Sequence, residues 1–237
     1  VVTGTPLNAP FHESFADGKY QNEGWWTTHD TEASGYVYEF KPLHGSSADS
    51  DREAMAFEAW NYWDSPDGVN ASLNTGKISL KDVENPSLIF WYFGYAEDAD
   101  LTFEVYVNDC GKSTDKVYEF VLHPGEYMDA YKRIEVALPQ YAGHDYVYIS
   151  FRGKNYDQTW AGMAIDNIQL RNVYDNNITV GMQLPPNFTA GISNDLPVTL
   201  HNTGKTSISA GYKISIKQNG NEIATTEGPA LESDELK

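Results

Sequence analysis

Alternating apolar and polar positions dominate the first two thirds of the chain. Short runs rich in Val, Ile, Tyr and Phe recur between turns of Gly, Pro and Asn-Asp, and no long stretch has a helical period. These runs are YVYEF, SLIFWYFGY, LTFEVYV, KVYEFVL, RIEVAL, YVYISF and MAIDNIQL. A period of two places alternate side chains on opposite faces of a strand. The pattern therefore predicts an all-β protein, built as an antiparallel sandwich of two sheets.

The pattern changes after Val173. The segment VYDNNIT has the polar, turn-forming character of a linker, and the strands predicted beyond it are shorter. We place a domain boundary near Asp175, which gives domains at 1–174 and 176–237. The second domain has only about 60 residues, fewer than the roughly 100 of a complete immunoglobulin-like sandwich. We expect it to be incomplete, and the chain to be a piece of a longer array of modules.

Two carboxylates interrupt apolar faces of the predicted strands. By strict alternation, Asp166 in MAIDNIQL lies on one face with Ala164, Ile168 and Leu170. Glu13 in PFHESF interrupts an apolar face in the same way. Burying an unpaired charge costs several kcal/mol or shifts the group to its neutral form. Each carboxylate should therefore have a partner.

A cation shared by these carboxylates is one solution. The first and last strands of a sandwich are often neighbours, and two carboxylates brought together repel unless one is protonated or a cation lies between them. Oxygen ligands favour Ca²⁺. We expect Glu13 and Asp166 to bind it, with Asp17 and Glu58 as further candidate ligands. The alternative is that each acid accepts backbone N–H bonds in a turn.

Charge and composition narrow the classes of partner. The chain has 34 acidic and 16 basic residues and a formal charge of -18, so it should repel nucleic acid. No apolar run approaches the roughly 18 residues of a membrane span. Cys110 is the single cysteine, which excludes an internal disulfide and multi-cysteine metal sites. It lies in a predicted hairpin turn, and no histidine stands at a spacing that indicates a catalytic thiol.

Aromatic-rich loops are the candidate ligand-binding segments. They are GWWTTHD, WNYWDSPDG and NYDQTWAG. Aromatic rings stack on sugars or anchor protein interfaces, while neighbouring Asp and Asn side chains bind hydroxyl groups. We select Trp160, Tyr156, Trp63 and Tyr62 as candidates, and Trp160 first because polar residues flank it. The alternative is that these side chains belong to the core of the sandwich.

Several segments resemble a known family when they are taken in order. ESFADGKYQNEGWWTTHD, AMAFEAWNYW, NASLNTGKISL, LTFEVYVND, YKRIEVALPQYAGHDYVYISFRG and MAIDNIQL resemble MAM-like and gingipain-type cleaved-adhesin domains, over roughly residues 11–173. The resemblance implies a jelly-roll β-sandwich from a bacterial surface or secreted protein, with structural calcium. By the same resemblance, Glu13, Glu58 and Asp166 fall on acidic positions of the family. The cysteines of animal MAM domains are absent.

The flanking segments carry two further resemblances. VTLHNTGKTSISAGYKISIKQNGNEIA resembles a CARDB-type immunoglobulin-like module, most clearly in its NTG turn. VVTGTPLNAPFHESF is similar to the junction that follows a fibronectin-type module. These resemblances imply adjacent modules in an extracellular protein.

Together these features favour a non-catalytic, extracellular or cell-surface adhesion module that binds a glycan or an extracellular protein. The rival class is a glycoside hydrolase, or an accessory domain of a carbohydrate-processing enzyme, on the same fold. Glu13 and Asp166 would then be the two carboxylates, about 5–5.5 Å apart in a retaining enzyme. Both lie in apolar strands rather than in a predicted cleft, and the GxSxG and HExxH motifs are absent. We therefore assign no catalytic residues.

Overall fold

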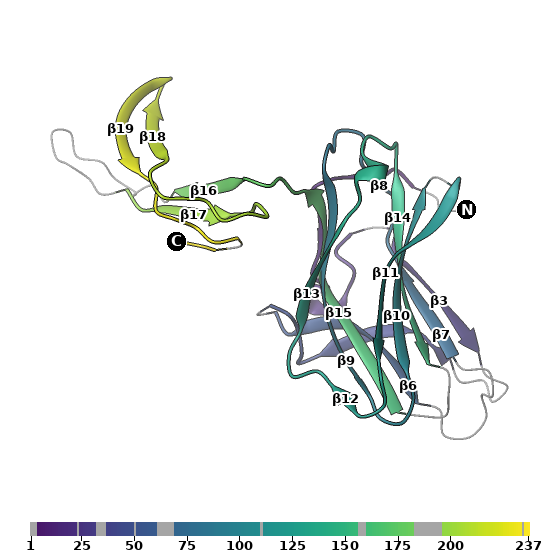
Figure 1. Ribbon diagram of the computed structural model, residues 1–237. Helices are drawn as coiled ribbons and strands as arrows, with labels where there is room; N and C mark the ends of the chain where they lie inside the picture. Colours follow the sequence, from purple (N-terminus) through teal and green to yellow (C-terminus); the bar gives the residue numbers. More distant parts are fainter. Residues whose placement is uncertain are drawn as a thin grey trace. The chain divides into compact units, whose positions relative to one another are not determined.

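The computed structural model forms two compact units, Val1–Asn172 and Val173–Lys237. It describes residues 4–22, 24–31, 37–49, 51–60, 69–109, 111–155, 160–182, 196–233 and 235–237. Strands dominate both units (Figure 1), and the helices of the described part are two single 3₁₀ turns, η1 (Ala16–Gly18) and η2 (Pro139–Tyr141). The all-β prediction is confirmed. No helix in the described ranges is long and apolar enough to cross a membrane.

One layer of the first unit is an eight-stranded sheet. Its main path runs β11-β10-β14-β7-β3-β4, and the short strands β8 and β1 join at one end of β14. Its strands are β1 (Leu7–Asn8), β3 (Trp26–Thr31), β4 (Val37–Tyr38), β7 (Val69–Asn74), β8 (Ile78–Ser79), β10 (Leu101–Asp109), β11 (Ser113–Leu122) and β14 (Val147–Asn155).

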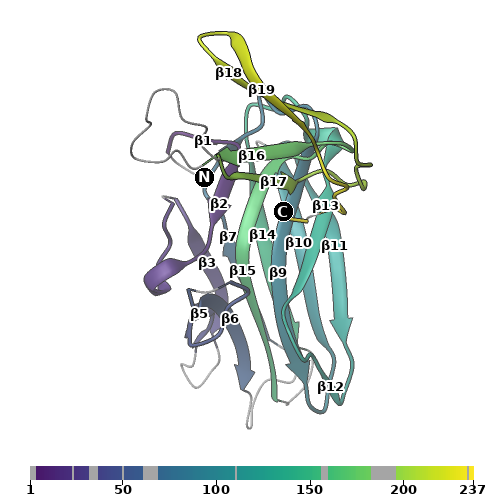
Figure 2. The ribbon, with the colours of Figure 1, turned by 90° about the vertical axis from the view of Figure 1, so that its left-hand side faces the viewer.

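The other layer is a seven-stranded sheet. Its path runs β12-β9-β15-β6-β5, with β13 beside β9 and β2 beside β15. Its strands are β2 (Phe11–Glu13), β5 (Phe40–His44), β6 (Glu53–Trp60), β9 (Pro86–Ala96), β12 (Glu126–Tyr127), β13 (Lys132–Ala137) and β15 (Trp160–Asn172). Figure 2 shows β2 beside β15, so the strand that carries Glu13 is a neighbour of the last strand of this unit, as predicted.

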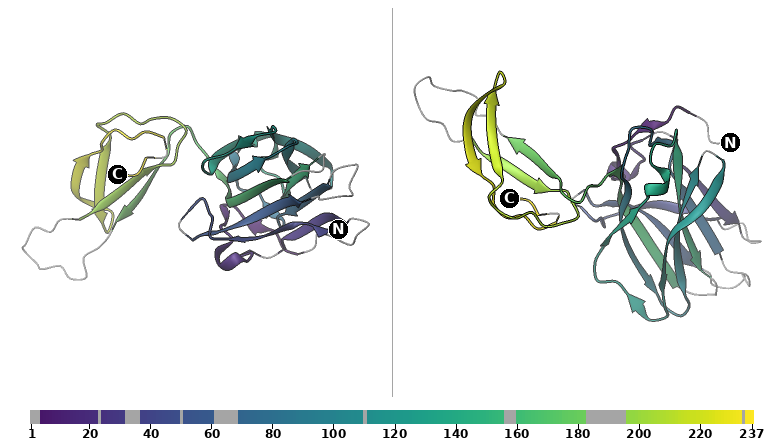
Figure 3. Two further views of the ribbon diagram at one scale, coloured as in Figure 1. Left: turned by 90° about the horizontal axis from the view of Figure 1, so that it is seen from below. Right: turned by 45° about the horizontal axis from the view of Figure 1, so that its top comes forward.

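Figure 3 shows the two layers of the first unit, and aromatic side chains pack between them. Phe90 of the seven-stranded sheet packs edge-on against Phe103 and Phe151 of the eight-stranded sheet, with ring centroids 5.7 and 5.5 Å apart. All three side chains are almost completely buried. At Gly153 on β14, an added Cβ atom would lie 2.4 Å from Cδ1 of Phe57, so only glycine allows that ring to approach the backbone. The alternation of the sequence thus produces a sandwich core.

The described part of the second unit contains two strand pairs. They are β16 (Ile178–Met182) with β17 (Val198–Asn202), and β18 (Lys213–Gln218) with β19 (Asn221–Glu227). Asn202, from the predicted NTG turn, is fully buried, and its amide donates to the carbonyls of Thr206 and Glu232 at 2.8 and 3.0 Å. Its Oδ1 accepts the N–H of Gly204 at 3.0 Å. This asparagine therefore organises the turn from inside the unit.

Candidate cation site and adjoining pocket

Asp166 lies at a β-bulge in β15. The register of β15 against β9 shifts between Asp166 and Gln169, and Asn167 has a left-handed φ of 51°. A bulge adds one residue and reverses the alternation beyond it. Ile165 and Ile168 therefore both lie in the core, while Asp166 lies on the outer face of the seven-stranded sheet. The prediction that Asp166 shares a face with Ile168 is wrong, because strict alternation takes no account of a bulge.

A loop nevertheless buries Asp166 completely on that outer face. The loop joins β5 to β6 and is called here the 45–52 loop. Ala48 donates its N–H to Oδ2 of Asp166 at 2.7 Å, and Asn167 donates to Oδ1 at 2.6 Å. Within the loop, Oγ of Ser47 donates to the carbonyl of Asp49 and accepts the N–H of Arg52, at 2.7 and 2.9 Å. The loop thus has a defined shape that presents its own acids to Asp166.

Three carboxylates meet at this point. Asp49, Asp51 and Asp166 each offer an oxygen, and these oxygens lie within 4.8 Å of one another. We call these three residues the acidic group. Burial, together with the charges of Asp49 and Asp51, raises the pKa of Asp166 to about 7, although the two backbone N–H bonds act to lower it. Burial, with the neighbouring Asp51, also raises the pKa of Asp49. A divalent cation bound to these oxygens would relieve this repulsion.

Glu13 lies outside the acidic group in the part of the chain that the structure describes. Its carboxylate is fully buried and accepts backbone N–H bonds from Phe15, Gln21 and Asn22 at 2.9 to 3.0 Å. The side-chain amide of Asn22 adds a bond at 3.1 Å. Glu13 therefore closes a turn, which is the alternative that the sequence left open. A cation shared by Glu13 and Asp166 has no support in this geometry.

Of the other two predicted ligands, Asp17 lies away from the acidic group, and the side chain of Glu58 is outside the described part of the chain. Asp17 is exposed in η1 with a φ of 60°, and it is not a member of the acidic group among the described residues. Glu58 lies in β6 opposite Gly162, and its side chain lies outside the described part, so its role stays a prediction. Sequence reasoning missed Asp49 and Asp51, although the acidic pair in SSADSDREA was a visible signal.

An open pocket adjoins the acidic group. It has a volume of about 510 Å³. Ten residues line this loop pocket: Gly45, Ser46, Ser47, Ala48, Asp49, Arg52, Phe93, Asp129, Ala130 and Tyr131. The rings of Phe93 and Tyr131 lie 5.5 Å apart and form an aromatic wall. The remaining wall offers hydroxyl, carboxylate and guanidinium groups, which suits a ligand that has both apolar faces and hydroxyl groups.

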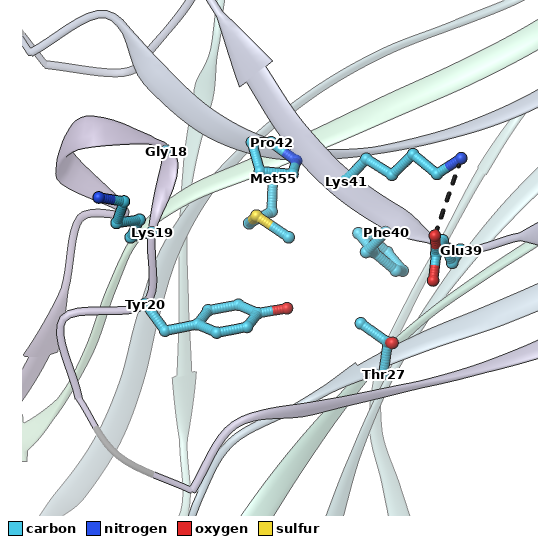
Figure 4. Close-up of a pocket in the computed structure, with 9 residues that line it drawn as sticks. All are labelled: Gly18, Lys19, Tyr20, Thr27, Glu39, Phe40, Lys41, Pro42 and Met55. Atoms are coloured by element: carbon cyan, nitrogen blue, oxygen red, sulfur yellow. Dashed lines mark ion pairs between the residues drawn. The ribbon is translucent and has the colours of Figure 1, made fainter.

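A second pocket lies beside η1 and β5 (Figure 4) and has a volume of about 480 Å³. The hydroxyl of Tyr20 points into it, and the ring of Tyr20 stacks on Trp25 at 5.5 Å. Burial and the nearby charges of Glu39 and Glu13 raise the pKa of Tyr20. Glu39 pairs with Lys41 at 3.8 Å on the opposite side. The two charges compensate each other, so this pocket offers less specific recognition than the loop pocket.

The side chains of the four predicted aromatic ligand residues lie outside the described part of the chain. Trp160 begins β15, opposite Trp60 of β6, and its side chain lies outside the described part. Tyr62, Trp63 and Tyr156 lie outside the described residues. Their assignment to a ligand site stays a prediction. The aromatic wall of the loop pocket instead comes from Phe93 and Tyr131, which lie on strand β9 and just before β13.

Comparison with solved structures identifies similar folds. A cleaved adhesin domain of Lys-gingipain from Porphyromonas gingivalis has a TM-score of 0.50 and 20% identity, with 68% of this chain and 97% of that domain covered. Another cleaved adhesin domain of the same protein has a TM-score of 0.46 and 20% identity, with coverages of 68% and 98%. A carbohydrate-binding module in complex with β-1,4-galactotriose has a TM-score of 0.46 and 13% identity, with coverages of 68% and 94%.

No protein-family model matches the sequence, and no curated protein matches it. The likeness to solved structures therefore concerns the fold. It confirms the jelly-roll sandwich that the resemblance to cleaved adhesins implied. The chain has the β-sandwich fold of a gingipain cleaved adhesin domain.

Proposed function

We propose that this protein is a non-catalytic, extracellular or surface-attached module that binds a glycan in the loop pocket. The pocket has an aromatic wall of Phe93 and Tyr131 and a polar wall that includes Asp129. Sugar rings have apolar faces and hydroxyl edges that match these two walls. The shared fold with a domain named as an adhesin supports a role in attachment.

The acidic group would bind a structural calcium ion. Its members are carboxylates, the ligands that Ca²⁺ prefers, and the raised pKa of Asp166 is consistent with a site that lacks its countercharge. Two residues belong both to the loop pocket and to the surroundings of Asp166. Asp49 lines the pocket and is a member of the acidic group, and Ala48 lines the pocket and donates its N–H to Asp166. This sharing carries the proposal, because an ion there would hold one wall of the pocket in place.

The glycosidase alternative needs two carboxylates that reach a sugar in an open cleft. Glu13 and Asp166, the pair considered for this role, are both fully buried. Glu13 is also surrounded by the N–H groups of its turn. Neither side chain can contact a glycosidic oxygen without local unfolding, which favours binding without turnover.

The test is a glycan array with purified protein in calcium and in EDTA. Asp129→Ala should weaken binding of neutral glycans that the array identifies, because it removes an exposed carboxylate from the pocket wall. Asp98→Ala removes an exposed acid from the turn after β9 and serves as the charge-matched control. Phe93→Leu should weaken binding as well, since it removes half of the aromatic wall. Equal binding by all four proteins, or hydrolysis of the bound glycan, would refute the proposal.

A further inference from the structure

The outer face of the eight-stranded sheet is lined with polar side chains. Alternation places the apolar residues of β7, β10 and β14 in the core, so their intervening residues lie on the opposite face. In the views of Figures 1 and 3, no described helix or strand of the first unit lies over this face. Among these intervening residues are Asn74, Glu104, Asn108, Tyr148, Ser150 and Arg152.

A chain of hydrogen bonds crosses this face over five strands. Thr114 donates to Oδ1 of Asn108 at 2.6 Å, and the amide of Asn108 donates to Ser150 at 3.2 Å. Ser150 donates to Oδ1 of Asn74 at 2.6 Å, and the amide of Asn74 donates to the carbonyl of Trp26 at 3.2 Å. Each side chain is held by its neighbours, so the face is organised before any ligand arrives.

Glu104 compensates the lysines on this face. It is 4% exposed and accepts bonds from Lys154 at 2.7 Å, Tyr106 at 3.0 Å and Lys116 at 3.4 Å. Burial alone would raise its pKa, but the bonds from Lys154 and Tyr106 outweigh burial and lower the pKa. Lys116 also pairs with Glu119. The positive charges of the two lysines are therefore matched by the negative charges of Glu104 and Glu119.

Arg152 has no acidic partner among the described residues. Its Nη2 donates to Oδ1 of Asn70 at 2.9 Å. Glu104 lies opposite it in register but gives its oxygens to the two lysines and Tyr106. An arginine that pairs with none of the acids in the described ranges, on an organised polar face, indicates a ligand that supplies the anion.

Aromatic rings lie further along the same strand. Trp26 and Tyr148 have ring centroids 5.3 Å apart with an interplanar angle of 56°. Tyr148 and Arg152 are four residues apart on β14, a distance of about 13 Å at the rise of a strand. That span is longer than one sugar ring, so a ligand that reaches both ends has at least two sugars.

We propose that this face binds an acidic oligosaccharide, with one carboxylate on Arg152 and a sugar ring on Trp26 and Tyr148. A guanidinium binds a carboxylate with two parallel hydrogen bonds, and aromatic rings cover the apolar face of a pyranose. One arginine without a described acidic partner suits a sparsely charged glycan, since the net charge of -18 repels a dense polyanion. The site is on the opposite sheet from the loop pocket and does not depend on it.

Titration calorimetry with two matched pairs of probes tests the proposal. One pair is sialyllactose and lactose, and the other is a xylo-oligosaccharide with and without a single glucuronic acid branch. At least one acidic probe should bind about tenfold more tightly than its neutral partner, and added salt should reduce the difference. The pair that shows the preference identifies the source of the carboxylate.

Variants locate the site. Arg152→Gln should remove the preference for the acidic probe, and Arg152→Lys should keep part of it because the charge remains. Trp26→Ala should weaken both members of the pair. Arg133→Gln, on the other sheet, is the matched control and should change nothing. Equal binding of acidic and neutral probes, no binding of either, or an acidic preference that survives Arg152→Gln in the folded variant would overturn the proposal.

Discussion

Removal of calcium should make the stability of this protein depend on pH through Asp166. Its pKa is about 7 in the folded protein and 3.8 in the unfolded chain. The folded state therefore holds this proton more tightly than the unfolded chain does. Below pH 3.8 the carboxyl is protonated in both states and does not destabilise the fold. As pH rises from 3.8 to 7, the unfolded chain ionises first and stability falls. A difference of about 3 pKa units corresponds to about 4 kcal/mol, lost in full above pH 7.

Urea denaturation in EDTA at pH 5, 6, 7 and 8 measures this loss. The free energy of unfolding should fall by about 1.4 kcal/mol per pH unit between pH 5 and 6, and by less as the pH approaches 7, relative to Asp166→Asn. That variant has no proton to lose at this position, while the control Asp98→Asn should keep the slope of the wild type. Calcium at a hundredfold excess over its dissociation constant should add about 2.7 kcal/mol near pH 8 and flatten the slope.

The same experiment can contradict the acidic group as a cation site. If calcium and EDTA give the same slope, the three carboxylates do not bind the ion. If Asp166→Asn retains the slope of the wild type, Asp166 is not the group that titrates. The two outcomes separate the protonation of Asp166 from the binding of calcium, because the first needs no ion and the second does.

Three further predictions concern the framework. Glu13→Gln should destabilise the protein by about 2–4 kcal/mol in urea denaturation, since the NH2 group of the new amide replaces one of the two oxygens that accept N–H bonds in its turn, and its response to calcium should equal that of the wild type. Gly153→Ala should destabilise by about 1–3 kcal/mol, since its Cβ atom would contact Phe57, whereas Gly181→Ala, 3.8 Å from the nearest side-chain atom, should be tolerated on thermal melting. Limited proteolysis should release a stable piece that ends near Asn172, and cleavage confined to residues 11–170 would count against the boundary.

The sequence by itself determined the class of fold. Period-two alternation depends only on the geometry of a strand, so the apolar face of β10 and that of β14 were readable from the printed residues. The pairing of β2 with β15 was also predictable, because sandwiches commonly place strands from the two ends of a domain side by side. The sequence also marked Glu13 and Asp166 as acids that need partners, and both are fully buried.

Only the tertiary structure decided which partners these acids have. A bulge at Asn167 moved Asp166 to the outer face, and a bulge has no reliable sequence signal. Asp49 and Asp51 reach Asp166 from a loop more than 110 residues earlier in the chain, as the separation of 118 residues between Ala48 and Asp166 shows. Alternation reports which face of a strand a residue occupies, but the packing of the loop over that face decides what meets it.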